Sequence, residues 1–242
     1  MDGADNIVKA RLRIAELEKE NKALREEVAA LHHRPRELQR ALSVADIASM
    51  KKQTLKLGGA WRAAFGEPER CGVWFIWGNS GNGKTNFTLQ LCLELTKFGR
   101  VAYNSLEEGD SLSMRESILR SGLLGARGRF VLLHESMADL SERLSRRKGP
   151  DFVVIDSFQY TQMSYRAYIE FKERHRDKTL IFVSHADGNR PSGRAAKSVV
   201  YDASLKIWVE GYKAFSKGRY FGPAGEYVIW PERAAVYWGA GV

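Results

Sequence analysis

Cysteine is scarce in this chain, and long apolar runs are missing from it. Its two cysteines, Cys71 and Cys92, fit no metal-binding spacing, which argues against a cysteine-based zinc site and favours a reducing, cytoplasmic compartment. No stretch of about 18 apolar residues occurs, so we expect neither a membrane-spanning helix nor a membrane partner. The charged N-terminal residues also lack the apolar core of a secretory signal.

Acidic residues are in the minority. The chain carries 38 lysines and arginines against 29 acidic residues, a net charge of +9. Residues 1–35 hold seven residues of each sign, so the whole excess lies in the remainder of the chain. This asymmetry is typical of proteins with a nucleic-acid partner, although a merely soluble basic surface would have the same composition.

The first 35 residues have the heptad pattern of a coiled coil. Because β-branched a positions with leucine at d favour two parallel strands, we expect this helix to self-associate, with residues 7–31 also open to a protein partner. The alternative is a solvated helix that packs on its own domain. The pattern places Ile7, Ile14, Asn21 and Val28 at a, and Ala10, Leu17, Leu24 and Leu31 at d.

Residues 36–60 are interpreted as a helical linker. Pro35 ends the first helix, and a second helix is expected to begin at Ser43, which Asp46 would help to cap, and to run toward Leu57. The domain organisation predicted from the sequence is therefore a coiled-coil helix over 1–35, a linker over 36–60 and the main domain over 61–242.

From Cys71 onward, short apolar runs alternate with helical stretches. Such alternation predicts an α/β fold with a buried, mostly parallel central sheet. After residue 200 we expect no further helix, only hairpin strands at 204–210, 213–220, 226–230 and 235–238. The expected strands are 73–77, 101–103, 130–133, 152–155 and 180–183, and the expected helices are 84–98, 110–121, 137–146 and 164–175.

One segment fits the phosphate-loop pattern G-x-x-x-x-G-K-[ST]. It follows an apolar strand and precedes a helix, so its backbone amides and the helix N-terminus would face the phosphates of a nucleotide such as ATP. Lys84 would reach the outer phosphates, and the Thr85 hydroxyl would bind Mg²⁺. The candidate nucleotide-binding residues are Gly78, Asn79, Ser80, Gly81, Asn82, Gly83, Lys84, Thr85 and Asn86.

Carboxylates follow two of the expected strands. Asp156 ends the run FVVID, where it could hold Mg²⁺ together with Thr85. Glu107 and Glu108 follow the strand at 101–103. Because attack on a γ-phosphate needs an oriented, partly deprotonated water, Glu107 is the predicted catalytic base and Glu108 the alternative.

These residues resemble the RecA-type P-loop ATPases, most nearly the DnaB helicase and RadA (Sms) branch, over about residues 60–238. YNSLEEGDSLSMR resembles the family segment whose glutamate is the catalytic base, which implies that role for Glu107. FVVIDSFQ resembles the Walker B strand, which implies a metal role for Asp156. TLIFVSHADG resembles the strand whose polar end senses the γ-phosphate, which implies that role for His185.

The segment SKGRYFG, residues 216–222, resembles the K-x-R hairpin of DnaB and the KNRFG motif of RadA. In that family the two cations reach the nucleotide of a neighbouring subunit. The resemblance therefore implies a homo-oligomer, a ring or a filament, in which Lys217 and Arg219 act in trans. On a strand, a lysine and an arginine two residues apart share one face and can approach one phosphate together.

Residues 186–202 read as a mobile loop broken by glycine and proline, which carries Arg190, Arg194 and Lys197. In RecA-like ATPases the loop after the sensor strand grips single-stranded DNA, and cations in such a loop suit backbone phosphates. The alternative is an insertion that regulates nucleotide access.

The function predicted from these features is a DNA-dependent ATPase for replication or recombination, in the setting of a phage or mobile element. The first alternative is a nucleotide-switched, KaiC-like adaptor that recruits a partner through its coiled coil. The second is a small-molecule kinase, against which Glu107 and the absence of an obvious lid argue. RadA's zinc finger and DnaB's helical N-terminal domain have no counterpart in the sequence, so unwinding activity is not implied.

Overall fold

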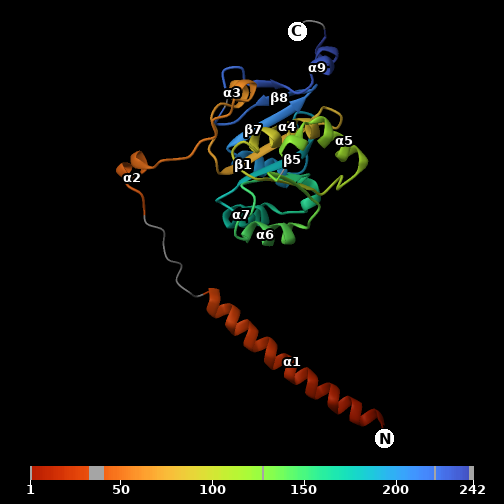
Figure 1. Ribbon diagram of the computed structural model, residues 1–242. Helices are drawn as coiled ribbons and strands as arrows, with labels where there is room; N and C mark the ends of the chain where they lie inside the picture. The colour runs from red at the N-terminus through yellow and green to blue at the C-terminus, as the bar shows by residue number, and fades with distance from the viewer. Residues whose placement is uncertain (1, 33–40, 127, 221, 240–242) are drawn as a thin grey trace. The chain divides into compact units, whose positions relative to one another are not determined.

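A computed structural model of the chain describes residues 2–32, 41–126, 128–220 and 222–239, with side chains from residue 9 to 24 in the first helix. The residues divide into two compact units, Met1–Lys51 and Lys52–Val242, which are described separately (Figure 1). Within the described residues, no helix is long and apolar enough to cross a membrane.

The first unit contains two helices, α1 (Asp2–His32) and α2 (Val44–Ser49). The predicted cap of α2 is confirmed, because the Ser43 hydroxyl accepts a hydrogen bond from the Asp46 amide at 3.2 Å while the Asp46 carboxylate accepts one from the Ser43 amide at 2.8 Å. The expected extension of this helix to Leu57 is wrong. The backbone turns to an extended conformation at Met50, which is the C-cap.

Helix α1 presents the predicted apolar stripe to solvent. Every side chain described in it, from residue 9 to 24, is exposed, including Ile14, Leu17 and Leu24. Ile7, Val28 and Leu31 lie outside the side chains that the structure describes. The coiled coil itself therefore stays a prediction.

The second unit begins before the expected domain boundary. Leu55 and Leu57 are buried in its core, and Thr54 bridges to Glu69. Helix α3 (Gly59–Phe65) then buries Ala64 and Phe65. Residues 52–60, interpreted from the sequence as linker, thus pack as part of the main domain.

The sheet confirms the predicted α/β architecture. Its strand order is β3-β2-β4-β5-β1-β7-β8-β9, and β6 pairs only with β5. The strands from β3 to β7 along this order are parallel, whereas β8 and β9 add to β7 as antiparallel strands. The bounds are β1 (Gly72–Gly78), β2 (Val101–Ser105), β3 (Phe130–Leu133), β4 (Phe152–Asp156), β5 (Thr179–Asp187), β6 (Arg190–Pro191), β7 (Leu205–Glu210), β8 (Lys213–Ser216) and β9 (Glu226–Val228).

Helices cover both faces of the sheet (Figure 1). Successive residues of a strand point to opposite faces, so Trp74 and Ile76 of β1 join one core while Phe75 and Trp77 join the other. The first core is closed by α3, α4 (Lys84–Leu95), α5 (Leu112–Arg120) and η1 (Leu123–Ala126). The second is closed by α6 (Met137–Ser145), η2 (Phe158–Thr161), α7 (Tyr165–Arg174) and α8 (Arg194–Asp202).

Three expectations for the C-terminal part are wrong. The segment 186–202 is not an irregular loop, because α8 buries Ala196 and Val199 at helical spacing. Residues 235–238 belong to a helix, α9 (Pro231–Trp238), which starts with proline in its first turn. Strand β8 ends at Ser216 instead of residue 220, so Lys217 and Arg219 do not share the face of a strand.

Candidate nucleotide-binding site

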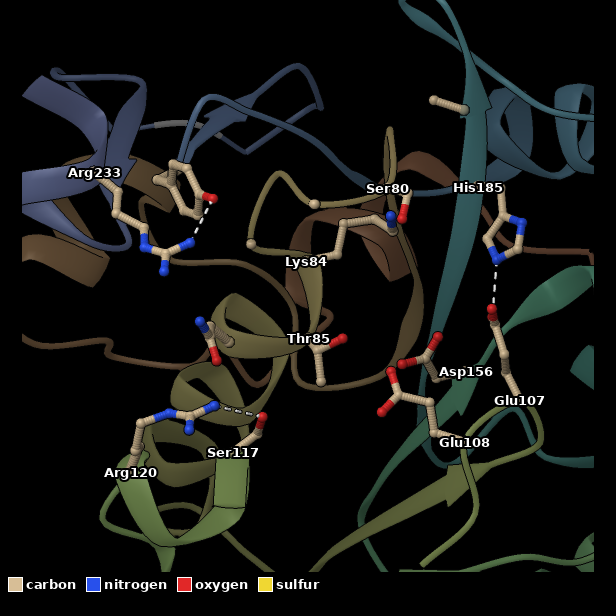
Figure 2. Close-up of a pocket in the computed structure, with 15 residues that line it drawn as sticks. Ser80, Lys84, Thr85, Glu107, Glu108, Ser117, Arg120, Asp156, His185 and Arg233 are labelled. Carbon is tan, nitrogen blue, oxygen red and sulfur yellow. Dashed lines mark hydrogen bonds and ion pairs between the residues drawn. The ribbon is translucent and has the colours of Figure 1, made fainter. Parts of the chain in front are cut away.

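A cavity of about 480 Å³ opens at the carboxyl ends of the parallel strands, beside the N-terminus of α4 (Figure 2). In open α/β sheets this edge is where ligands bind, because loops from several strands converge there. The cavity is lined by Ser80, Gly81, Gly83, Lys84, Thr85, Asn86, Glu107, Glu108, Ser117, Arg120, Asp156, His185, Ala186, Tyr212 and Arg233.

The glycines of the phosphate loop are required by close approach and by backbone conformation. A Cβ on Gly78 would lie 2.2 Å from the Val209 carbonyl oxygen of the neighbouring strand. Gly83 has a φ of +92°, and a Cβ there would lie 3.1 Å from the Tyr212 ring. Side chains are therefore excluded from both positions, and the loop can curl tightly into α4.

Two asparagine side chains connect the phosphate loop to neighbouring segments by hydrogen bonds. The Asn82 side-chain oxygen accepts a hydrogen bond from the Gly211 amide at 2.7 Å, and the Asn79 amide group donates to the Gly188 carbonyl at 3.3 Å. Gly78, Asn79 and Asn82, predicted to bind the nucleotide, do not line the cavity. The two asparagines instead hold the loop in shape against the β7–β8 turn and the segment after β5.

Lys84 lies in the loop with its ammonium group turned back on the backbone. It donates a hydrogen bond to the Asn79 carbonyl at 3.0 Å. Burial lowers the pKa of Lys84, while the carboxylates of Asp156 and Glu107 act in the opposite direction. A phosphate oxygen in the loop would offer this cation a stronger, charged acceptor than the carbonyl that it contacts here.

Asp156 ends β4 inside the cavity, next to Thr85 (Figure 2). The Tyr103 hydroxyl donates a hydrogen bond to its carboxylate. The pKa of Asp156 is raised to about 6, chiefly by burial and also by the neighbouring Glu107, whereas the Tyr103 hydrogen bond and Lys84 act in the opposite direction. At neutral pH the group is thus mainly a carboxylate, but one held in an unfavourable environment.

The two glutamates that follow β2 point to different neighbours. Glu107 pairs with His185, whose Nε2 lies 2.8 Å from the Glu107 carboxylate. Glu108 accepts a hydrogen bond from the Ser113 hydroxyl at 3.0 Å and lies beside Asp156 in Figure 2. Because both carboxylates line the cavity, the geometry keeps the predicted base Glu107 and its alternative Glu108 as candidates.

His185 is itself held by a polar network at the end of β5. Its amide donates to the Gln159 side-chain oxygen at 3.2 Å, and the Gln159 amide group donates to the Ser184 hydroxyl at 2.8 Å. The imidazole is therefore placed against Glu107 by the strand and by Gln159, a residue that sequence reasoning did not single out.

Sequence reasoning also missed the cations on the opposite side of the cavity. Arg120 of α5 and Arg233 of α9 face the loop across from the carboxylates (Figure 2). The Arg233 guanidinium lies 4.5 Å from the Trp230 ring centroid and donates to the Tyr212 hydroxyl at 3.0 Å. No motif marks these residues, and the expected strand at 235–238 concealed the helix that carries Arg233.

Five other predicted residues lie outside this cavity. Lys217 and Arg219 are exposed in the segment after β8, and the Lys217 ammonium lies 4.4 Å from the Trp208 ring centroid. Arg190, Arg194 and Lys197 are exposed on β6 and α8. The fold thus brings the phosphate loop, the three carboxylates and His185 together in one cavity. The basic residues at 217–219 and those at 190–197 do not line this cavity.

The cavity fits the hard, oxygen-binding cation that the motif implies. Mg²⁺ binds through one or two protein oxygens together with phosphates and water, and the Thr85 hydroxyl and the Asp156 carboxylate are such oxygens within one cavity. The residues that the structure describes contain no cluster of three or more histidine, cysteine or acidic side chains that could hold a metal alone. Bound there, Mg²⁺ would neutralise part of the phosphate charge.

Because burial disfavours the charged form of Asp156, we expect that replacing this residue with a neutral one stabilises the folded protein. Since its folded pKa of about 6 lies above the ordinary 3.8, its contribution to stability is lost as the pH rises through 6. Asp156→Asn should therefore stabilise the metal-free protein at pH 7.5 by up to about 3 kcal/mol in urea unfolding, and by much less near pH 4.

The matched control for this prediction is Asp202→Asn. That carboxylate pairs with Lys172 at 2.9 Å, so its replacement should destabilise the protein at neutral pH. If Asp156→Asn is no more stable than the wild-type protein at pH 7.5, the charged form of Asp156 is not disfavoured in the folded protein.

Comparison with known proteins identifies the fold. No protein-family model and no curated protein matches the chain. A KaiC-like protein from the hyperthermophilic archaeon Pyrococcus horikoshii OT3 matches with a TM-score of 0.54 and 16% identity over 74% of this chain and 99% of that one. The flagellar accessory protein FlaH from Methanocaldococcus jannaschii gives a TM-score of 0.45 and 16% identity over 64% and 81%. The chain has a RecA-like α/β fold with a mostly parallel central sheet.

Proposed function

We propose that this protein is a Mg²⁺-dependent ATP hydrolase. One observation carries the proposal: a single cavity collects the phosphate loop with Lys84 and Thr85, the carboxylates of Glu107 and Asp156, and His185. These groups come from the ends of β1, β2, β4 and β5. Each has a separate task in phosphoryl transfer to water, and their convergence supports that reaction more than nucleotide binding alone.

The arrangement supports Glu107 as the group that activates water. Its side chain is about one-third exposed, so a water can reach it, and His185 restrains one of its oxygens. The water oxygen forms a bond to the γ-phosphorus as the bond from that phosphorus to the β-phosphate oxygen breaks. Glu107 accepts the water proton, and ADP and inorganic phosphate result.

Arg120 and Arg233 support a direction for the bound nucleotide. They lie across the loop from the carboxylates (Figure 2). The γ-phosphate is then at the side of Glu107 and His185, while the two arginines and the aromatic Tyr212 flank the other end. Planar arginine and aromatic side chains can pack against the base and the ribose, which carry no negative charge.

We also propose that hydrolysis is coupled to binding of single-stranded DNA by Arg190, Arg194 and Lys197. These side chains are exposed, and none of them has an ion-pair partner in the part of the chain that the structure describes. Arg194 and Lys197 are three residues apart on α8, so they share one helix face.

Hydrogen bonds connect this basic segment directly to the nucleotide site. The Ser192 amide donates to the His185 carbonyl at 2.9 Å, and Gln159 donates to the Ser192 carbonyl at 3.0 Å. Asn79 of the phosphate loop donates to Gly188, and Trp77 donates to the Asn189 carbonyl at 3.1 Å. A change at His185 or in the loop is therefore transmitted to residues 188–192 through bonded neighbours.

Assembly into a ring or filament would complete the site. Lys217 and Arg219 are exposed and do not line their own cavity, as expected of groups that act on a neighbour's nucleotide. The exposed apolar stripe of α1 provides a surface through which copies could pair. The same stripe favours the second candidate function, a nucleotide-switched adaptor, in which α1 recruits a different protein and DNA has no effect on turnover.

The roles of the two glutamates are separable by matched substitutions. Glu107→Gln should lower kcat for ATP hydrolysis by about 10²-fold or more while leaving Mg-ATP affinity within a few-fold, because only the transition state needs the base. Glu108→Gln should cost much less. Steady-state hydrolysis and equilibrium binding measure the two effects, and a larger loss for Glu108→Gln would assign the base to Glu108.

Shared sites predict complementation between inactive variants. Arg219→Ala should bind nucleotide but turn it over at least about tenfold more slowly, because a transition-state cation is lost. Mixing it with Glu107→Ala should restore activity, since mixed oligomers contain sites with both groups intact. Hydrolysis of the mixture no faster than the sum of the two variants would rule out action in trans.

DNA coupling predicts salt-sensitive stimulation. Single-stranded DNA should raise the ATPase rate at 50 mM salt and much less at 200 mM salt, because phosphate contacts release counterions (about 10³-fold weaker binding for six contacts). The variant Arg194→Ala/Lys197→Ala should lose the stimulation but keep basal hydrolysis. Arg166→Ala/Arg176→Ala removes the same charge from α7 and the segment after it and should behave as wild type. An ATPase indifferent to DNA at both salts points to the adaptor instead.

A further inference from the structure

A second cavity, of about 300 Å³, lies at the amino ends of the parallel strands, whereas the phosphate loop lies at their carboxyl ends. It is bounded by the amino ends of β2, β3 and β4 and by the segment that follows α6. Because these strands are parallel, this cavity and the nucleotide site open at opposite ends of the strands.

The lining of this second cavity is strongly cationic. Six basic residues are among those that line it, and no acidic residue is among them in the described part of the chain. They come from three separate stretches, so a single charged helix end does not explain them. These cations are Arg100, Arg129, Arg143, Arg146, Arg147 and Lys148.

Four of the six cations are not neutralised by an acid. The guanidinium groups of Arg100 and Arg129 donate to the neutral carbonyls of Gly149 and Thr96, at 2.9 and 3.1 Å, while the Arg100 backbone amide donates to the Asp151 carboxylate at 2.9 Å. Arg147 and Lys148 have no side-chain partner among the described residues, whereas Arg143 and Arg146 pair with Glu135 and Glu142. Gathering unpaired like charges is unfavourable, and an anion bound between them would relieve the repulsion.

The backbone around the cavity is fixed. Asp151 and Phe152 donate to the Arg100 carbonyl at 2.8 and 3.0 Å, and Val101 donates to the Arg129 carbonyl at 2.8 Å. Lys148 adopts a φ of +65°, which lysine rarely does outside a constrained turn. The cations are thus carried by an ordered scaffold, with one residue in a strained conformation of the kind that clusters at binding sites.

The other residues that line this cavity indicate which further chemical groups the ligand has. Val101, Ala102, Val131 and Pro150 contribute apolar surface beside the cations. A volume of about 300 Å³ is at the small end of the range of ligand pockets, about 300–1,000 Å³. A simple inorganic anion would use the charges but leave this apolar surface uncovered.

We propose that this cavity is a second binding site, for a nucleotide unit whose phosphates contact Arg100, Arg129, Arg147 and Lys148. Its sugar and base cover the apolar surface. The unit is supplied either as a free nucleotide or as part of a single strand, which share the same chemistry. The site shares no residue with the nucleotide cavity, so its binding can be measured separately from ATP hydrolysis.

Calorimetric titration of the full chain carrying Lys84→Ala tests this proposal without interference from the phosphate loop. The probes are adenosine 3′,5′-bisphosphate, which represents one nucleotide unit, and 5′-phosphorylated pentathymidylate, which represents a strand. Both are titrated into this protein, into the same protein with Arg129→Ala/Arg147→Ala, and into a control with Arg166→Ala/Arg176→Ala. Thermal unfolding of each protein verifies that it is folded.

The proposal expects at least one probe to bind, with a dissociation constant raised about tenfold or more by Arg129→Ala/Arg147→Ala and unchanged in the control. Tighter binding of the bisphosphate assigns a free nucleotide, and tighter binding of the pentamer assigns a strand. A charge-reversed protein, Arg147→Glu/Lys148→Glu, should behave like the double alanine variant. Absence of binding by both probes, or equal weakening in the control, overturns the proposal.

Discussion

The nucleotide site is organised around an imbalance of charge. Lys84 lines the same cavity as Asp156, Glu107 and Glu108, so the side of the cavity that would receive the γ-phosphate is lined with carboxylates. A triphosphate cannot enter such a site on the strength of one ammonium group, because its own negative charge is repelled there. In the proposed complex, loop amides, the N-terminus of α4 and a divalent cation on Asp156 and Thr85 would together make binding favourable. The same carboxylates would then take part in the proposed hydrolysis.

Hydrogen bonding extends this local constraint through the domain. Asn82 fixes the loop to the β7–β8 turn, Asn79 and Trp77 fix it to the segment after β5, and His185 connects Glu107 to the same segment. Hydrogen bonds therefore link the phosphate loop, Glu107 and residues 188–192. The second cavity lies at the other ends of the strands, where no such bond to the loop is described.

The sequence was most informative where local pattern alone decides structure. Five of the six parallel strands, the four helices between them and the Ser43 cap are confirmed, because hydrophobic period and capping chemistry are local. It was wrong for α8, which follows Gly193, and for α9, which begins with Pro231, because these turn signals outweighed the helical period. Strand β8 ends at Ser216, the last residue that pairs with β7, and sequence does not display this register. Arg120, Arg233 and Gln159 could not be found, since they reach their sites only through tertiary packing.

Direct measurement of Mg-ATP binding by calorimetry, on full-length folded protein, tests the central claim. The account predicts binding at the phosphate loop, with affinity that falls steeply when Mg²⁺ is withdrawn and when Lys84 is replaced by alanine. No detectable binding of Mg-ATP, or binding that is indifferent to both Mg²⁺ and Lys84, would contradict it.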